Sequence, residues 1–176
     1  MPDFSDTTPF AGPFSTIDNP RLEFVMEVQL TFPEVHTIAP HPHGGMRTAV
    51  LVQGGHFEGP NLKGRAVPGS GGDYAYFRPD DVAVFDARYL LEEDDGTPIL
   101  LHNKGYLWGR KPDTMERLRD WAFRDGNPIE AQEYYLRGNP TFEVPVGKHD
   151  WLTKHVFIGV GERRKNGNVL RYYALT

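Results

Sequence analysis

The chain has 176 residues, of which 39% are hydrophobic and 24% are charged, and its formal net charge at pH 7 is -5. A domain of this size and composition can bury a core without disulfides or metals. The acidic balance argues against nucleic acid as a partner, because phosphate binding needs a clustered basic face. The absence of cysteine excludes disulfides, thiolate nucleophiles, iron–sulfur clusters and cysteine-based zinc sites.

No apolar run approaches the roughly 18 residues of a membrane span, and the N-terminus shows no signal-peptide pattern. We therefore expect a cytoplasmic protein with no membrane partner.

The first twenty residues predict an extended arm, at 1–21, that precedes a single domain at 22–176. They contain four prolines and no hydrophobic periodicity. They also contain Phe4, Phe10 and Phe14, which a free tail seldom needs. Two alternatives remain for the arm: it is disordered, or it docks onto the domain or onto a second subunit. We expect a homo-oligomer, a dimer formed through the arm or through a face of the domain.

From residue 22 onward the sequence reads as short β-strands. In LEFVMEVQLTF, at 22–32, every second residue from Phe24 to Leu30 is apolar, which is typical of a half-buried strand. Similar runs follow, separated by turns such as EEDDGTP at 92–98 and RKNGN at 164–168, whose Asn-Gly pair favours a type I′ hairpin. Such a series predicts an all-β fold, and an antiparallel barrel is favoured because closure leaves no exposed edge.

One segment, KPDTMERLRDWAFRDG at 111–126, has helical rather than strand periodicity. Its apolar residues recur at helical spacing from Met115 to Ala122, and Asp113 or Thr114 can cap its start. We predict one inserted helix of about three turns that covers one face of the barrel.

Four stretches of the chain resemble the domain of unknown function 3237 family. They are GGHFEGPNLKGRAVPGSGGDY at 54–74, FDARYLLEEDDGTPILLHNKGY at 85–106, YYLRGNPTFE at 134–143 and WLTKHVFIGVGER at 151–163. The resemblance implies a lipocalin-like antiparallel barrel with a central cavity, and it leaves the activity unassigned. Members commonly have Ala-Asp-Trp where this chain has Gly72-Asp73-Tyr74, and the helical insert and the HPHGG loop are less typical. Substrate preference therefore does not follow from the family.

Asp86 and Arg88 are the leading candidates for a site. Alternation in DVAVFDARYLL, at 81–91, places them on one face of a strand whose two faces are both largely apolar. Burying an ion pair there is costly, because desolvation can cancel the Coulombic gain. The functional hypothesis is that Asp86 lines a cavity as general acid or base, with Arg88 binding an anionic oxygen. The alternatives are a structural ion pair that plugs the barrel and an exposed face.

Asp73 and Asn103 are candidates on neighbouring segments. The glycines of GSGGDY allow positive φ or a close backbone approach, so this loop could hold Asp73 towards the barrel mouth as a second catalytic carboxylate. An Asx-turn or a cap is the alternative. Asn103 shares a face with Ile99 and Leu101, and an interior amide can orient a carbonyl or carboxylate. A solvent-facing Asn103 is the alternative.

Tyr135 and Arg137 share one face of a later strand and are candidate substrate-binding residues. Together with Arg88, Arg137 would suit an enolate, phenolate or carboxylate; decoration of the outer face is the alternative. Phe142 and Trp151 are expected in the core or in a cavity wall, which could contact a flat apolar ligand.

His36, His41 and His43 are close enough in sequence to form a three-histidine metal site. Their spacing is weakly specific and no carboxylate motif accompanies them, so we predict no metal. His43 is a reserve catalytic candidate, as a proton shuttle at the barrel mouth. Arg47 opens the following strand and is expected to bind substrate at the same mouth.

The sequence has no Walker loop, G-x-S-x-G elbow, H-E-x-x-H motif or Rossmann fingerprint, so we expect no cofactor. The leading hypothesis is a cofactor-independent acid–base enzyme, a lyase, isomerase or cyclase. Its substrate would be a small, mostly apolar, oxygenated aromatic or polyketide-like molecule in the barrel cavity. Asp86 would move the proton, with Arg88 and Arg137 stabilising the oxyanion, so Asp86→Asn should abolish turnover. The alternative is a non-catalytic lipocalin-like binding protein, which would return its ligand unchanged.

Overall fold

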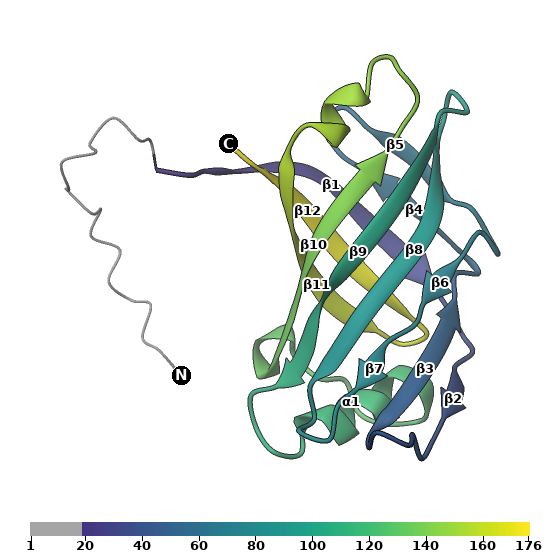
Figure 1. Ribbon diagram of the computed structural model, residues 1–176, viewed down its shortest axis with the longest axis vertical. Helices are drawn as coiled ribbons and strands as arrows, with labels where there is room; N and C mark the ends of the chain where they lie inside the picture. The colour runs from purple at the N-terminus through teal and green to yellow at the C-terminus, as the bar shows by residue number, and fades with distance from the viewer. Residues whose placement is uncertain (1–18) are drawn as a thin grey trace.

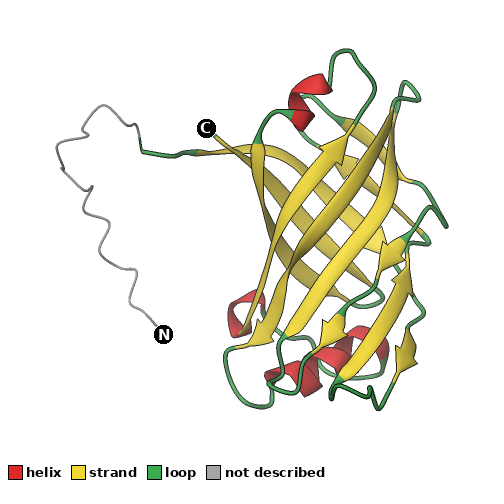
Figure 2. Ribbon diagram, in the orientation of Figure 1, coloured by secondary structure: helices red, strands yellow, loops and turns green. Residues whose placement is uncertain are grey.

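A computed structural model describes residues 19–176, which form a closed antiparallel β-barrel of eight strands (Figures 1 and 2). The strands are β1 (Leu22–Thr31), β4 (Gly54–Glu58), β5 (Lys63–Ala66), β8 (Ala83–Glu93), β9 (Pro98–Gly109), β10 (Tyr134–Glu143), β11 (Val156–Arg164) and β12 (Gly167–Leu175). Around the barrel the order is β1-β12-β11-β10-β9-β8-β5-β4, and β4 pairs with β1. The predicted barrel is confirmed. Most of the predicted arm at 1–21 lies outside the described residues.

Four short strands widen the sheet beside β8. They are β2 (His36–Ile38), β3 (Met46–Leu51), β6 (Gly72–Asp73) and β7 (Tyr76–Phe77). β5 pairs only with the last residues of β8, from Leu91 to Glu93, so the first half of β8 is free to pair with β6 and β7. β3 pairs with β6 and β7 in turn, and β2 forms the edge.

Two predicted hairpins are present, one between β8 and β9 and one between β11 and β12. The second turn differs from the prediction by one residue. Arg164 pairs with Gly167, so the turn residues are Lys165 and Asn166, and Asn166 alone of the two has a positive φ, of 56°. A type I′ turn requires positive φ at both positions, so this turn belongs to another type.

The predicted helix is α1 (Thr114–Phe123), which lies across one end of the barrel, at the bottom of Figure 1. Its buried side chains Met115, Leu118 and Trp121 pack with Phe85 and other inward residues of the barrel wall. Two short 3-10 helices complete the fold, η1 (Ala131–Glu133) and η2 (Asp150–Thr153). Among residues 19–176 no helix is long and apolar enough to cross a membrane.

The barrel interior is filled by the apolar face of each strand. In β8 the inward residues alternate between small and large, in the order Ala83, Phe85, Ala87, Tyr89 and Leu91. Alternation of this kind is common inside small barrels, because large side chains fill the space that small ones leave. Asp86, Arg88 and Glu92 of the same strand therefore lie on the outer face.

Candidate functional site

A cavity of about 140 Å³ lies inside the barrel, and α1 contributes Arg119 and Phe123 to its wall. An engineered protein cavity of about 150 Å³ holds a benzene molecule, so this cavity matches one six-membered ring. Most of the wall is apolar. The polar residues of the wall are Thr37, Thr48, Asp73, Asn103, Arg119, Arg163 and Asn168, together with the phenol of Tyr89.

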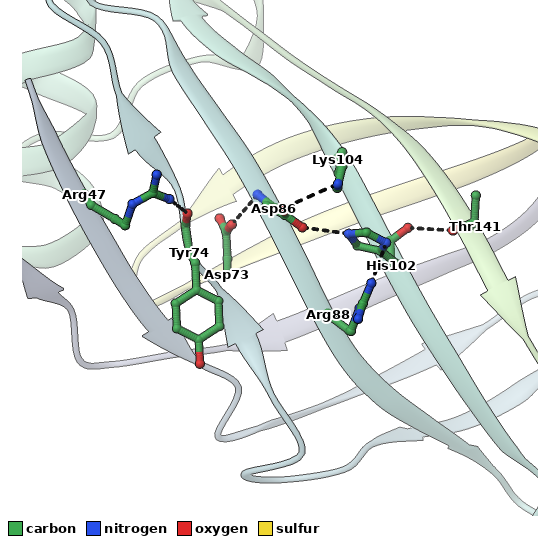
Figure 3. Close-up of polar contacts among 8 residues, drawn as sticks. All are labelled: Arg47, Asp73, Tyr74, Asp86, Arg88, His102, Lys104 and Thr141. Atoms are coloured by element: carbon green, nitrogen blue, oxygen red, sulfur yellow. Dashed lines mark hydrogen bonds and ion pairs between the residues drawn. The ribbon is translucent and has the colours of Figure 1, made fainter. Parts of the chain in front are cut away.

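Asp73 is the carboxylate of this cavity. It stands opposite Val50 on β3 and Ala87 on β8, both of which also line the cavity, so its side chain shares their inner face. The backbone N–H of Asp86 donates a hydrogen bond of 2.9 Å to Asp73 Oδ1 (Figure 3). Burial raises the pKa of Asp73 from its ordinary 3.8 to about 6, although this hydrogen bond and the charge of Arg163 oppose the rise.

The glycines before Asp73 are needed for its position. A Cβ at Gly71 would lie 2.0 Å from the carbonyl oxygen of Arg88, and one at Gly72 would lie 2.2 Å from that of Val50. No real Cβ comes so close to a backbone atom, so only glycine lets β6 fit between β3 and β8. The predicted close backbone approach is therefore present, and it holds Asp73 in the cavity wall.

Arg163 is the cation deepest in the cavity wall. Its guanidinium lies beside the packed rings of Phe32 and Phe123, 5.2 and 5.1 Å from their centroids, and Nη1 donates to Asn168 Oδ1 at 2.9 Å. Burial lowers the pKa of Arg163 to about 10, although the charge of Asp73 opposes the fall, so the side chain remains a cation at neutral pH. Within the described chain Arg163 forms no ion pair. Asp73 lies beyond ion-pair distance and affects the pKa of Arg163 only through its charge.

Tyr89 and Asn103 are the most deeply buried polar residues of the cavity wall, with side chains 1% and 2% exposed. Asn103 Nδ2 donates to the hydroxyl of Tyr172 at 3.2 Å, which fixes the orientation of the amide. The Tyr89 hydroxyl also interacts with that of Tyr172, and burial raises the pKa of Tyr89 well above its ordinary value, so its hydroxyl keeps its proton. Of the two positions open for Asn103, the structure shows the inward one.

The prediction that Asp86 and Arg88 line the cavity is wrong, because both lie on the outer face of the barrel (Figure 3). His102 on β9 joins them: its Nε2 lies 2.7 Å from Asp86 Oδ1, and its Nδ1 lies 3.1 Å from Arg88 Nη2. Since arginine only donates, Nδ1 accepts here and Nε2–H donates to Asp86. Lys104 adds a contact of 3.6 Å to Asp86. This is a cross-strand charge network on a solvated surface, which costs far less than a buried ion pair.

Tyr135 and Arg137 share a face, as predicted, but it is also the outer face. Tyr135 stacks on Trp108, with ring centroids 5.2 Å apart, and the guanidinium of Arg137 lies 5.2 Å from the Tyr135 centroid. The inward residues of this strand are Tyr134 and Leu136. The expectation that Arg137 joins Arg88 around a ligand is therefore wrong.

Arg47 and the three histidines also lie outside the cavity wall. Arg47 Nη1 donates to the carbonyl oxygen of Tyr74 at 2.8 Å on the outer face (Figure 3). His41 and His43 lie in the loop before β3, with ring centroids 5.4 Å apart, and His36 lies on β2. Within residues 19–176 no three histidine or carboxylate side chains come together as a metal-binding group.

Phe142 and Trp151 belong to the core, as expected, but not to the wall of this cavity. Phe142 packs edge-on against Phe157 with centroids 4.9 Å apart, and Trp151 of η2 packs against the same ring at 6.2 Å.

Sequence reasoning overlooked Arg163, Asn168 and Tyr89. The signal for Arg163 was present in KHVFIGVGERR, because alternation from Phe157 through Gly159 and Gly161 places Arg163 on the inner face. Its position among charged residues at a strand end suggested a surface instead. Tyr89 lies on the face of β8 opposite Asp86. Because the face of Asp86 was predicted to line the cavity, Tyr89 was not considered as a site residue.

Comparison with known proteins places this barrel in a family. The profile of the family described as "Protein of unknown function (DUF3237)" matches residues 20–175. The chain belongs to this family. A UPF0311 protein of Clostridium acetobutylicum is 28% identical over 92% of this chain and 98% of its own length. A solved structure of a β-barrel-like protein from Acinetobacter baumannii is 30% identical, covers 91% of this chain and 98% of its own, and has a TM-score of 0.76. A structure from Clostridium acetobutylicum, described as a protein with unknown function, is 26% identical with a TM-score of 0.79, covering 91% of this chain and 99% of its own. These relatives align with this chain over nearly all of the described barrel.

Proposed function

We propose that this DUF3237 protein is a cofactor-independent acid–base enzyme, a lyase, isomerase or cyclase, that acts on a small oxygenated ring compound in the barrel cavity. The supporting observation is that one ring-sized apolar cavity contains a carboxylate of raised pKa and a buried guanidinium that do not pair with each other. Asp73 is the general base, in place of Asp86. Arg163 stabilises the oxyanion, in place of Arg88 and Arg137.

The shared first step is the removal of a proton from carbon next to a carbonyl group. Asp73 takes the proton, and the electrons of the C–H bond move onto the carbonyl oxygen, which becomes an oxyanion beside Arg163. An isomerase returns the proton to another carbon. A lyase of the dehydratase kind expels hydroxide from the β-carbon, which leaves as water with the proton that Asp73 took. A cyclase forms a C–C bond from the enolate to a second carbonyl carbon of the same molecule, whose oxygen takes the electrons and the proton. With a pKa of about 6, Asp73 is ionised at pH 7 and its proton affinity lies close to the working pH. Asn168 holds the guanidinium in place.

Deuterium exchange tests this step without knowledge of the natural substrate. A panel of single-ring ketones is incubated with the protein in deuterium oxide, and loss of the α-proton signal is followed by NMR. We expect exchange above the buffer rate, rising as pH passes about 6, because only ionised Asp73 can act as the base. Asp73→Asn should remove about 10²–10⁴-fold of the acceleration, the usual contribution of a positioned base.

Asp86→Asn is the matched control, because it makes the same chemical change on the outer face of the neighbouring strand. It should leave exchange unchanged, the reverse of the expectation from sequence. Exchange that survives Asp73→Asn, or that is lost only in Asp86→Asn, would contradict the proposal.

The alternative function is non-catalytic binding of a similar molecule, favoured by the mostly apolar wall of this ring-sized cavity. A binding protein would hold single-ring ligands in this cavity and return them without deuterium, even after long incubation. Wild-type binding with no exchange at any pH would support this alternative over the enzyme.

We also propose a homodimer, in which residues 1–18 of one copy cover an apolar outer patch on the other. The patch lies where β1, β12 and β11 meet, and its members are Leu22, Phe24, Val156, Ile158, Tyr173 and Leu175. Leu22 and Val156 are 55% and 56% exposed. Arg21 pairs with Thr176 at the end of β12, so residues 1–18 join the barrel beside this patch. Phe4, Phe10 and Phe14 supply apolar groups to match.

A further inference from the structure

Arg163 is a half-buried cation of the cavity wall that forms no ion pair. Its one side-chain hydrogen bond within residues 19–176 goes to the neutral amide of Asn168, and no carboxylate of that range lies within ion-pair distance of it. The two neighbouring phenylalanine rings stabilise a cation only in part. The remaining N–H groups of Arg163 are therefore suited to an anion from outside the protein, because charge-assisted hydrogen bonds to an anion are stronger than those to neutral groups.

The charged groups of the cavity wall also favour an anion at Arg163. The wall contains two arginines, Arg119 on α1 and Arg163, and one carboxylate, Asp73. Arg119 is exposed to solvent, which screens its charge, so Arg163 sets the positive region inside the cavity. Because Arg163 does not pair with Asp73, an anion at Arg163 is favoured over a cation or a neutral molecule of the same shape.

We infer that the cavity binds its ligand as a ring-borne oxyanion, a phenolate or enolate, with the charged oxygen at Arg163 and the ring against Phe32 and Phe123. This inference rests on the proposed function for the choice of cavity and narrows the substrate class. It does not depend on turnover, because a phenolate that cannot react should bind as well.

The test uses 4-nitrophenol, whose phenolate absorbs visible light and whose neutral form does not. The ionised fraction of bound 4-nitrophenol is measured by absorbance over a pH series, and its affinity is compared with that of nitrobenzene, which cannot ionise. We expect the phenolate to bind about tenfold or more tightly than nitrobenzene, the scale of one charge-assisted hydrogen bond. The ionised fraction should also rise on binding at fixed pH.

Arg163→Met should remove this preference, whereas Arg137→Met, the same change on the outer face, should leave it intact. Arg163→Lys retains the charge and should retain part of the preference, so the test stands even if the methionine variant unfolds. Equal or tighter binding of nitrobenzene, no binding of either compound, or an unchanged preference in Arg163→Met would overturn the inference.

Asp73→Asn separates this inference from the proposed function. Removing the negative charge of Asp73 should strengthen phenolate binding, because it leaves Arg163 with no opposing charge in the cavity, and the proposed function requires the same variant to lose deuterium exchange. Stronger phenolate binding with undiminished exchange would reject the acid–base function alone. Lost exchange with no phenolate preference in the wild type would reject the anion site alone.

Discussion

Asp73 combines a buried position with a charge that its surroundings satisfy only in part. One backbone N–H and the field of Arg163 favour its ionised form, but burial outweighs them and raises its pKa from 3.8 to about 6. In the unfolded chain the carboxyl ionises near its ordinary value. The free energy of unfolding therefore falls as the pH rises above 3.8, because Asp73 ionises less readily in the folded state. The loss is complete above about pH 6.

Asp73→Asn should therefore stabilise the fold at pH 8 and change it little at pH 4. A shift of about two pKa units corresponds to about 3 kcal/mol, which is the upper limit of the gain. Urea unfolding of both proteins at the two pH values measures it. Asp86→Asn should behave in the opposite sense. Burial tends to raise the pKa of Asp86, but the His102 hydrogen bond and the charge of Lys104 outweigh it and lower the pKa, so ionised Asp86 contributes stability that is lost as pH falls. A gain from Asp73→Asn that is equal at pH 4 and pH 8 would contradict the assignment.

At the level of strands, alternation predicted which residues share a face but not which face is inside. In β8 both faces are largely apolar, and we expected the charged face to be buried with the cavity. In the structure the face of Ala83, Phe85 and Tyr89 points inward, because small and large side chains together fill a curved interior. For Asn103 the sequence left an inward and a solvent-facing position open, and the structure places it on the inner face with the buried Ile99 and Leu101.

Gly138 on β10 shows how one strand positions a polar group of the next. A Cβ at Gly138 would lie 2.2 Å from Asn103 Oδ1, so the amide occupies the space that glycine leaves. Gly138→Ala should displace the amide and cost about 1–3 kcal/mol, as overpacking usually does. In an Asn103→Ala background the same change should cost much less, because the clashing atom is gone. Urea unfolding of the four proteins gives the coupling energy, and additive effects would show that the two sites are independent.

At the level of the whole molecule, the barrel and its single helix followed from periodicity, turn residues and family resemblance. The site did not, because it depends on residues that meet only after closure: Asp73 from β6, Tyr89 from β8 and Arg163 from β11. Their separation in sequence is large, and no local pattern records that they share one cavity. The side of each strand that faces inward becomes decidable only when all eight strands are placed together.

The proposed dimer is a property of the whole molecule. Residues 1–18 can reach about 60 Å when extended, enough to cross from one barrel to the patch on another. We expect light scattering to give a dimer for the full chain and a monomer after deletion of 1–18, since the patch then loses the apolar groups that cover it. Replacing Phe4, Phe10 and Phe14 with serine in the full chain should have the same effect, because the phenylalanine rings supply the buried area. Replacing Thr7, Thr8 and Ser15 with alanine is the matched control and should leave the dimer intact. A dimer that persists without residues 1–18 would show that another face of the barrel joins the two copies, and a monomeric full chain would rule out the exchange of arms altogether.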